Sequence, residues 1–347
     1  MVILVVGSFK RFFYAPAFYH AWQALGHRVY RIDSDNYILK SKSPLSGFLN
    51  KVQEKYHIGI PLERYNEDIV KTVKQLKPDF VFLYRCHDVF DSTLKKIRKD
   101  TVIFSYNNDD PFSSNTQGIF KGHYLSNSRF CDLVYVYRKK NIDDFRHIGI
   151  EKTKVLLPYY MTSTNFPIPD IDKYIPIAFV GHFEDDGRDE VIKAMNEAGL
   201  PVTVYGKDYW RTKSKLYNEL KTIIKEPKSG SEYNTLLNQI QIALVFLSKR
   251  NNDTYTRRCF EIPAAKTLML APYTSDMDEL FPEGECAVYY RSTKDLIEKC
   301  RFLLSHPEEV KRIANAGYER LKVIGGSEVD RCKEVIQDFE IIKNKNI

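Results

Sequence analysis

The strongest constraint on the fold is a regular alternation of short apolar runs with longer amphipathic stretches. The chain begins with the apolar run Met1–Val6, continues with helical spacing over Tyr14–Leu25, and returns to a strand pattern at Arg28–Ile32. This opening is typical of two parallel strands joined by a helix in a right-handed crossover. Because the same alternation recurs through the chain, the sequence predicts an α/β protein built from doubly wound, Rossmann-like sheets.

Strand patterns occur in both halves of the chain. The further strands expected are Asp79–Tyr84, Thr101–Tyr106, Asp132–Tyr137, Lys154–Leu157, Ile177–Val180, Pro201–Tyr205, Thr222–Lys225, Ile242–Leu247, Thr267–Ala271 and Cys286–Tyr290. The proline-rich segment Pro158–Pro176 reads as a linker between the halves. We therefore expect one domain over residues 1–165, a second over 175–330, and a C-terminal helix over 331–347 that packs back on the first domain.

Composition narrows the classes of function. Of the 347 residues, 43% are hydrophobic and 13% aromatic, which argues against disorder. The apolar runs are shorter than the roughly 20 residues of a membrane span, and the first is too short for a signal peptide. The six cysteines lie far apart and form no CxxC pair, which indicates reduced thiols in a cytoplasmic protein.

The net charge of +7 comes from lysines scattered over the predicted helices, so no nucleic-acid track is expected. A mildly basic surface attracts acidic partners such as a nucleoside diphosphate, and allows at most peripheral contact with anionic lipid headgroups.

Polar clusters follow several predicted strands at their carboxyl ends, where ligands bind in doubly wound sheets. The clusters are Gly7–Arg11, Asn107–Asp110, Gly181–Arg188, Gly206–Lys207 and Ser248–Glu261. Since the first lacks the Gly-x-Gly-x-x-Gly fingerprint, a nicotinamide dinucleotide site is not supported. We expect several clusters to converge on a crevice between the domains, and the unpatterned segment Ile38–Pro61 to shape an acceptor site.

The stretch from Asp253 to Phe281 reads as a loop, a short helix, a buried strand and a second short helix. Asp253 or Thr254 is expected to cap the first helix. Two arginines and acids at such a place suggest a nucleotide or sugar-nucleotide site, because phosphates bind at strand ends and helix starts. The alternative is an ordinary surface helix in which Arg258 and Glu261 form an ion pair three residues apart.

These residues carry a resemblance to a known family. The runs Arg258–Ala265, Met269–Pro272 and Glu279–Phe281 resemble the core motif of the CgeB-like, spore-maturation-type glycosyltransferases. The downstream run from His306 to Arg320 is similar to the C-terminal signature of that family. Asn108–Pro111, Phe179–Gly181, Arg188 and Tyr205–Gly206 also resemble its patterns, and the match is strong from Ile177 to Arg331.

The resemblance implies a GT-B fold, in which two doubly wound Rossmann-like domains face each other across a cleft. It also implies a glycosyltransferase that moves a hexosyl or N-acetylhexosaminyl group from a nucleotide-sugar, a UDP-sugar first, to a glycan or cell-envelope acceptor. The donor would bind the C-terminal domain, with Glu261 on the ribose hydroxyls and Asp253 on the donor sugar. Two positions depart from the family pattern: Asp253 is a shorter acid than usual, and Lys266 replaces the glycine that lets the backbone approach the phosphates.

Glycosyl transfer without a metal requires cations that offset the charge of the departing diphosphate. We expect no obligatory metal or other cofactor, because within the polar clusters at the predicted strand ends only Asp109-Asp110 and Asp185-Asp186 pair aspartates. The candidate donor-binding residues are His182, Arg188, Gly206, Lys207, Arg257, Arg258, Glu261 and Lys266. The alternative for Arg188 is a surface salt bridge with Asp185 or Asp189, and the alternative for His182 is a turn histidine.

An inverting enzyme needs a general base on the acceptor side. Asp109, Asp110 and His87 are the candidates, and a packed or capping role is favoured for His87. Two other functions stay open at this point. One is a nucleotide-sugar epimerase of the same fold, and the other is a non-catalytic sugar-nucleotide-binding assembly protein, which the two departures from the family pattern favour.

Overall fold

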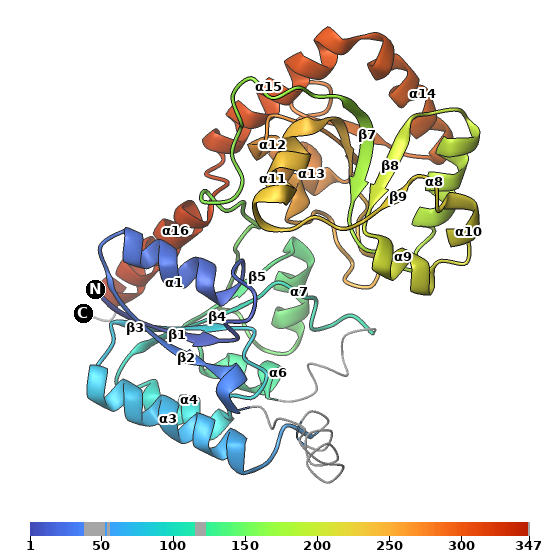
Figure 1. Ribbon diagram of the computed structural model, residues 1–347. Coiled ribbons are helices and arrows are strands. Elements are labelled where there is room, and N and C mark those ends of the chain that lie inside the picture. The colour runs from blue at the N-terminus through green and yellow to red at the C-terminus, as the bar shows by residue number, and fades with distance from the viewer. Residues whose placement is uncertain (38–52, 54–55, 115–122, 346–347) are drawn as a thin grey trace. The chain divides into compact units, whose positions relative to one another are not determined.

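The computed structural model describes residues 1–37, 53, 56–114 and 123–345, and its chain divides into two compact units (Figure 1). Unit 1 comprises Met1–Leu157 together with Glu328–Ile347, and unit 2 comprises Pro158–Ser327. Each unit contains its own six-stranded sheet, and the paired strands are parallel. The prediction of two doubly wound α/β domains is therefore confirmed. Residues 38–52 and 54–55 of the expected acceptor segment Ile38–Pro61 lie outside the described residues.

The sheet of unit 1 has the strand order β2-β1-β3-β4-β5-β6. Its strands are β1 (Val2–Gly7), β2 (Arg28–Asp33), β3 (Phe80–Tyr84), β4 (Val102–Asn107), β5 (Leu133–Val136) and β6 (Thr153–Val155). The chain winds in opposite directions from β1, so the carboxyl ends of β1 and β3 flank the switch point of this sheet.

Helices cover both faces of this sheet. They are α1 (Ala15–Ala24), η1 (Ser34–Tyr37), α3 (Ile60–Leu76), α4 (Asp91–Ile97), α6 (Tyr124–Asn127), η2 (Ser128–Phe130), α7 (Lys139–His147) and α16 (Glu328–Lys345). The helices α1 and α16 lie together on one face (Figure 1). There the indole nitrogen of Trp22 donates to the Cys332 carbonyl at 3.1 Å, and the rings of Phe80 and Phe339 lie 5.5 Å apart. Val81 and Leu83 alternate with Phe80 and pack in the core cluster of the opposite face.

The sheet of unit 2 has the order β12-β11-β10-β7-β8-β9. Its strands are β7 (Ile175–Val180), β8 (Val202–Tyr205), β9 (Ile224–Lys225), β10 (Ile240–Leu244), β11 (Leu268–Pro272) and β12 (Val288–Tyr290). Because β7 pairs with both β8 and β10, the switch point lies between the carboxyl ends of β7 and β10. The loops after these two strands are therefore where this topology positions a ligand.

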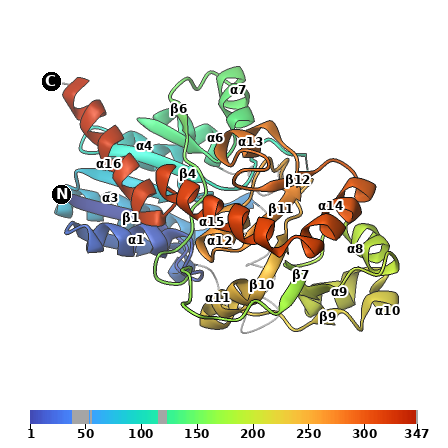
Figure 2. The same ribbon diagram turned by 90° about the horizontal axis from the view of Figure 1, so that it is seen from above.

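Helices also flank the second sheet. They are α8 (Arg188–Glu197), α9 (Lys207–Lys213), α10 (Tyr217–Leu220), α11 (Gly230–Gln239), α12 (Arg258–Ala264), α13 (Ser275–Leu280), α14 (Thr293–Ser305) and α15 (Pro307–Val323). The helices α12 and α15 lie side by side, as both views show (Figure 1, Figure 2). At Gly317 of α15 an added Cβ would meet the Cys286 carbonyl oxygen at 2.7 Å, so this position requires a glycine.

The start of α12 differs from the prediction. The helix begins at Arg258, and its N-cap Arg257 makes no side-chain capping bond, so the predicted cap at Asp253 or Thr254 is wrong. These two residues belong to the preceding loop, in which the Asp253 amide donates to the Ser248 carbonyl at 3.0 Å. The Thr256 hydroxyl instead accepts from the Arg258 amide at 3.3 Å. The loop after β10 is therefore longer than predicted, and α12 begins later, at Arg258.

Candidate functional site

A side-chain hydrogen bond spans the switch point of unit 2. Glu184 lies in the loop after β7, and its Oε2 accepts from the Ser248 hydroxyl, in the loop after β10, at 2.6 Å. The other carboxylate oxygen of Glu184 lies 3.1 Å from Nε2 of the exposed His182. One carboxylate therefore ties the two loops together and orients the histidine. Neither Glu184 nor Ser248 was singled out from the sequence, because nothing in their local spacing shows that the two loops meet.

The electrostatics of Glu184 follow from these partners. Burial raises the pKa of this carboxyl, but the hydrogen bonds from His182 and Ser248 and the charge of Arg188 outweigh burial and lower the pKa to about 2. Glu184 is therefore a stable anion across the physiological range. This anion lies beside the His182 ring.

Arg188 is buried and stabilises the loop after β7. Its guanidinium binds both carboxylate oxygens of Asp186, at 2.8 and 2.6 Å, and donates to the His182 carbonyl at 2.8 Å. It also lies 5.7 Å from the ring centroids of Phe179 and Phe246. The alternative of a surface salt bridge with Asp185 or Asp189 is wrong, since only 4% of the Arg188 side chain is exposed and its acidic partners are Asp186 and Glu184.

Glu261 lies in the first turn of α12 and is held from two directions. Its Oε1 lies 2.7 Å from Nε of Arg257, and its Oε2 accepts from the Tyr233 hydroxyl at 2.8 Å. Burial and the Glu261 charge raise the pKa of Tyr233 well above its ordinary value, so the phenol remains a donor. Since each carboxylate oxygen has two acceptor positions, Glu261 can still accept bonds from hydroxyl groups of a ligand.

The neighbouring Arg258 points elsewhere. Its Nε donates to the Val180 carbonyl at the end of β7. The alternative of an ion pair between Arg258 and Glu261 is therefore wrong, and Arg257 takes that place. Within the described part of the chain, the Arg258 guanidinium forms no ion pair. Arg258 thus lies at the switch-point edge of unit 2 without an ion pair to a described residue.

Gly206 and Lys207 follow β8 at the same edge of the sheet. At Gly206 an added Cβ would lie 2.1 Å from the Gly181 carbonyl oxygen, so the close approach of the loops after β7 and β8 requires a glycine. The amine of Lys207 pairs with Glu226 at the surface. Asp253 lies half-buried in the loop after β10. These three predicted residues therefore share an edge with His182, Arg258 and Glu261.

Lys266 lies at the opposite edge of the sheet. It follows the end of α12 and precedes the start of β11, and the amino ends of parallel strands point away from the ligand edge. Its amine lies 4.9 Å from the centroid of the Tyr318 ring on α15. Its backbone is left-handed, with φ of 49°, the conformation that a glycine adopts without strain. Lys266 therefore lies apart from the other predicted donor-binding residues of unit 2.

In unit 1, the predicted acids Asp109 and Asp110 differ in their surroundings. Asp109 follows β4 and pairs with Arg85, which follows β3 and lies 5.4 Å from the Tyr14 ring centroid. Asp110 is 0% exposed, and its Oδ1 accepts from the Asn141 amide at 2.8 Å and from the Phe112 backbone at 2.9 Å. Asp110 therefore clamps its own loop, whereas Asp109 stays partly accessible.

His87 also follows β3. Desolvation and the charge of Arg85 lower the pKa of His87 to about 3, so the ring is neutral at physiological pH and a weak base. The sequence did not identify Arg85 as a site residue, because its role depends on the pairing of β3 with β4.

In the described ranges, no three His, Cys, Asp or Glu side chains are grouped so that they could hold a metal ion. None of the described helices is both long and apolar enough to cross a membrane.

Comparisons with known proteins agree on the fold. Residues 188–323 match the family model described as glycosyl transferase-like, and no curated protein sequence matches the chain. Among solved structures, HepE of Anabaena in complex with UDP has 12% identity and a TM-score of 0.66, and covers 98% of this chain and 100% of that chain. HepE has also been solved with UDP-glucose.

Two further solved structures show the same similarity. Sucrose-phosphate synthase of Thermosynechococcus elongatus has 12% identity and a TM-score of 0.72, and covers 99% of this chain and 100% of that chain. A glycosyltransferase of Rickettsia africae has 13% identity and a TM-score of 0.68, with 98% of each chain covered. Similarity along almost the whole chain confirms the predicted GT-B fold class with its two Rossmann-like domains.

Proposed function

We propose that this chain, whose residues 188–323 match a glycosyl transferase-like family, transfers a sugar from a nucleoside-diphosphate sugar to a glycan or cell-envelope acceptor. The first donor to test is a UDP-sugar with a hexosyl or N-acetylhexosaminyl group, since the HepE structures contain UDP or UDP-glucose. Membership of the CgeB-like subfamily is part of this proposal.

One observation carries the proposal. Glu261 and Arg258 lie in the same turn of α12 at the switch-point edge of unit 2, and each is held by different partners. Glu261 is oriented by Tyr233 and Arg257, as a carboxylate must be to accept hydrogen bonds from the two hydroxyls of a ribose. Arg258 is oriented by a backbone carbonyl and, without an ion pair to a described residue, offers its charge to a diphosphate. A nucleoside diphosphate presents both groups.

The other predicted residues at this edge are assigned roles from their contacts and positions. His182, held by Glu184, donates to the diphosphate or to the donor sugar. Asp253 contacts the sugar hydroxyls, and Lys207 adds positive charge near the rim. Gly206 allows the close approach of two loops, and Arg188 supports the loop after β7 without touching the ligand.

The acceptor binds unit 1 in this proposal, and Asp109 is the preferred base if the enzyme inverts configuration. Its partial exposure supports this choice over the fully buried Asp110. The contact with Arg85 holds the Asp109 carboxylate in place. We propose that no metal is obligatory, because Arg258 supplies positive charge to the diphosphate and His182 donates a hydrogen bond to it.

Binding calorimetry with UDP, GDP, ADP and dTDP tests the donor site. We expect one nucleotide to bind the wild type, and Arg258→Ala and Glu261→Gln each to weaken its binding about tenfold, or about 1.4 kcal/mol. Arg312→Ala is the matched control, because Arg312 is an exposed arginine on α15 that pairs with Glu309. Equal binding by all variants, or no binding by the wild type, would contradict the proposal.

Turnover separates the transferase from a binding protein. The non-catalytic alternative depended on two departures from the family pattern, and one of them, Lys266, lies away from the ligand edge. We expect slow hydrolysis of the bound sugar-nucleotide in the absence of acceptor, and loss of this hydrolysis in Arg258→Ala. A tightly bound sugar-nucleotide that is never hydrolysed or transferred would favour the binding protein, and an epimerised donor would favour the epimerase.

A further inference from the structure

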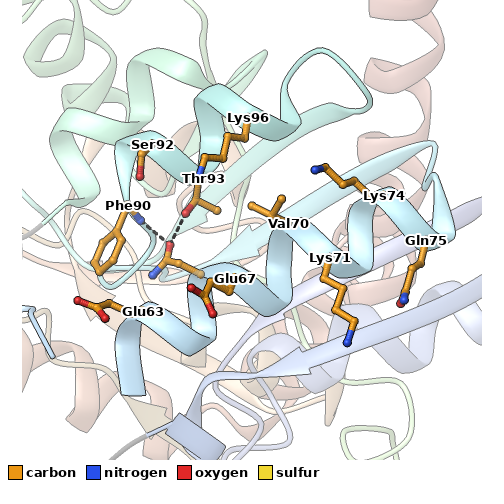
Figure 3. A pocket seen from close by; sticks show the side chains of 11 residues that line it. Glu63, Glu67, Val70, Lys71, Lys74, Gln75, Phe90, Ser92, Thr93 and Lys96 are labelled. Atoms are coloured by element: carbon orange, nitrogen blue, oxygen red, sulfur yellow. Dashed lines mark hydrogen bonds between the residues drawn. The ribbon is translucent and has the colours of Figure 1, made fainter. Parts of the chain in front are cut away.

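Unit 1 carries a concave feature, which none of the residues discussed above lines. A groove of about 590 Å³ lies between α3 and α4, and Figure 3 shows the side chains along it. Its width is fixed by Asn66 of α3, whose Oδ1 accepts from the Phe90 amide at 2.8 Å and from the Thr93 hydroxyl at 2.7 Å. The groove is therefore defined by hydrogen bonds between α3 and the start of α4.

The groove has a direction relative to the sheet. Both α3 and α4 run from the carboxyl edge of the sheet to its amino edge, because each precedes a parallel strand. Glu63 and Phe90 thus lie at the end nearest the carboxyl edge, where Asp109 follows β4. Lys74 lies at the other end, eleven residues after Glu63, or about 17 Å along the helix.

Charges in the groove are segregated along this direction. Glu63 and Glu67 lie at the carboxyl-edge end, and Lys71, Lys74 and Lys96 lie toward the amino edge. Glu67 and Lys71 are four residues apart, a spacing that favours an ion pair, yet the structure records no ion pair between described residues for any of these five side chains. Lys140 and Lys193, by contrast, pair with nearby acids.

We infer that this groove is an extended acceptor subsite for an oligosaccharide that carries anionic substituents such as phosphate, sulfate or carboxylate. The inference rests on the proposed transferase function. The three lysines would bind the anionic groups, the two glutamates would accept bonds from neutral sugar hydroxyls, and the half-buried Phe90 ring offers a face for a sugar. The end at Glu63 lies on the edge of Asp109, so the acceptor terminus would project toward the proposed base.

The segregation of charge selects this ligand over a uniformly anionic polymer. A nucleic acid strand carries a charge on every residue, and Glu63 and Glu67 would repel its part of the chain. A flat lipid surface would not enter a groove between two helices. A glycan with both charged and neutral stretches matches both ends of the groove.

The test measures equilibrium binding of dextran, sparsely sulfated dextran and sparsely carboxymethylated dextran oligosaccharides of equal length, in which unsubstituted stretches remain, without donor. We expect the wild type to bind one of the two anionic dextrans at least tenfold more tightly than dextran. The triple variant Lys71→Gln/Lys74→Gln/Lys96→Gln should lose this preference. The matched control Lys215→Gln/Lys221→Gln/Lys311→Gln changes three exposed lysines outside the groove and should retain it.

Two variants make the test specific to the groove. Val70→Phe fills the groove without changing charge and should also weaken binding tenfold. Glu63→Gln/Glu67→Gln should not strengthen binding, because the two carboxylates accept hydrogen bonds from neutral sugar hydroxyls and do not face the anionic groups. Stronger binding in this variant, equal loss in the control triple variant, or no binding by the wild type would each overturn the inference. Nucleotide calorimetry on the same variants should be unchanged, so a failure here is distinct from a failure of the donor site.

Discussion

Ser248 Oγ donates a 2.6 Å hydrogen bond to Glu184 Oε2, and this bond joins the loops that follow β10 and β7. At the switch point of unit 2, a hydrogen bond between two side chains thus connects the two loops. The ionised form of Glu184 is the form that makes this bond and the bond to His182, so the connection depends on pH.

We predict that Glu184→Gln removes an acid-sensitive part of the stability. The pKa of Glu184 is lowered from 4.5 to about 2, so its contribution is complete above pH 4.5 and declines as the pH falls toward 2. Denaturant unfolding should show a loss of about 2 kcal/mol at pH 7 that shrinks at pH 3. The exposed Glu197→Gln serves as the control, and a pH-independent loss in Glu184→Gln would contradict the prediction.

Arg188→Met should destabilise unit 2 by about 3–5 kcal/mol, because it leaves the buried carboxylate of Asp186 without its partner. Denaturant unfolding measures the effect. Adding Asp186→Asn should restore part of the loss, since the second change removes the stranded charge. A loss below 1 kcal/mol in the single variant would indicate an ordinary surface pair.

Gly206→Ala should disrupt the edge of the sheet at which the donor is proposed to bind. Its Cβ would lie 2.1 Å from a backbone oxygen, so the two loops must separate, and we expect a loss of at least about 2 kcal/mol in unfolding free energy. Gly199→Ala is the control. Its Cβ meets nothing within 4 Å, and only the strain of φ at 74° remains, at about 1 kcal/mol.

Lys266→Gly should leave nucleotide affinity within twofold of the wild type, because the residue lies at the amino edge. Relief of the left-handed backbone at φ 49° should raise the unfolding free energy by up to about 1 kcal/mol. Lys266→Val should lower it, since a branched side chain tolerates this conformation poorly. Calorimetry and thermal unfolding report the two effects separately, and a tenfold change in affinity would restore a role at the donor site.

The strands could be predicted from the sequence because parallel strands are buried on both faces and therefore appear as apolar runs. The run Thr101–Tyr106 and the observed β4, Val102–Asn107, differ by one residue at each end. The acids, arginines and glycines that were predicted to follow the strands likewise lie at the carboxyl edges of the two sheets.

The pairing of charges could not be predicted in the same way. Glu261 is held by Tyr233, 28 residues earlier, and no local spacing contains that contact. The choice of Asp186 over its neighbours as the partner of Arg188 depends on the turn at Gly187, whose φ is 94°. The place of Lys266 at the amino edge could not be predicted either, because a family motif aligns residues without showing which edge of the sheet each one occupies.

The course of the chain through the two units has a consequence for synthesis. Unit 2 is complete once Ser327 has been made, but unit 1 still lacks α16 at that moment. Until α16 emerges from the ribosome, the apolar face that Trp22 and Phe80 form with it is open to water. We expect the domain that begins first to finish folding last, and to be the part of the nascent protein that most needs protection by chaperones.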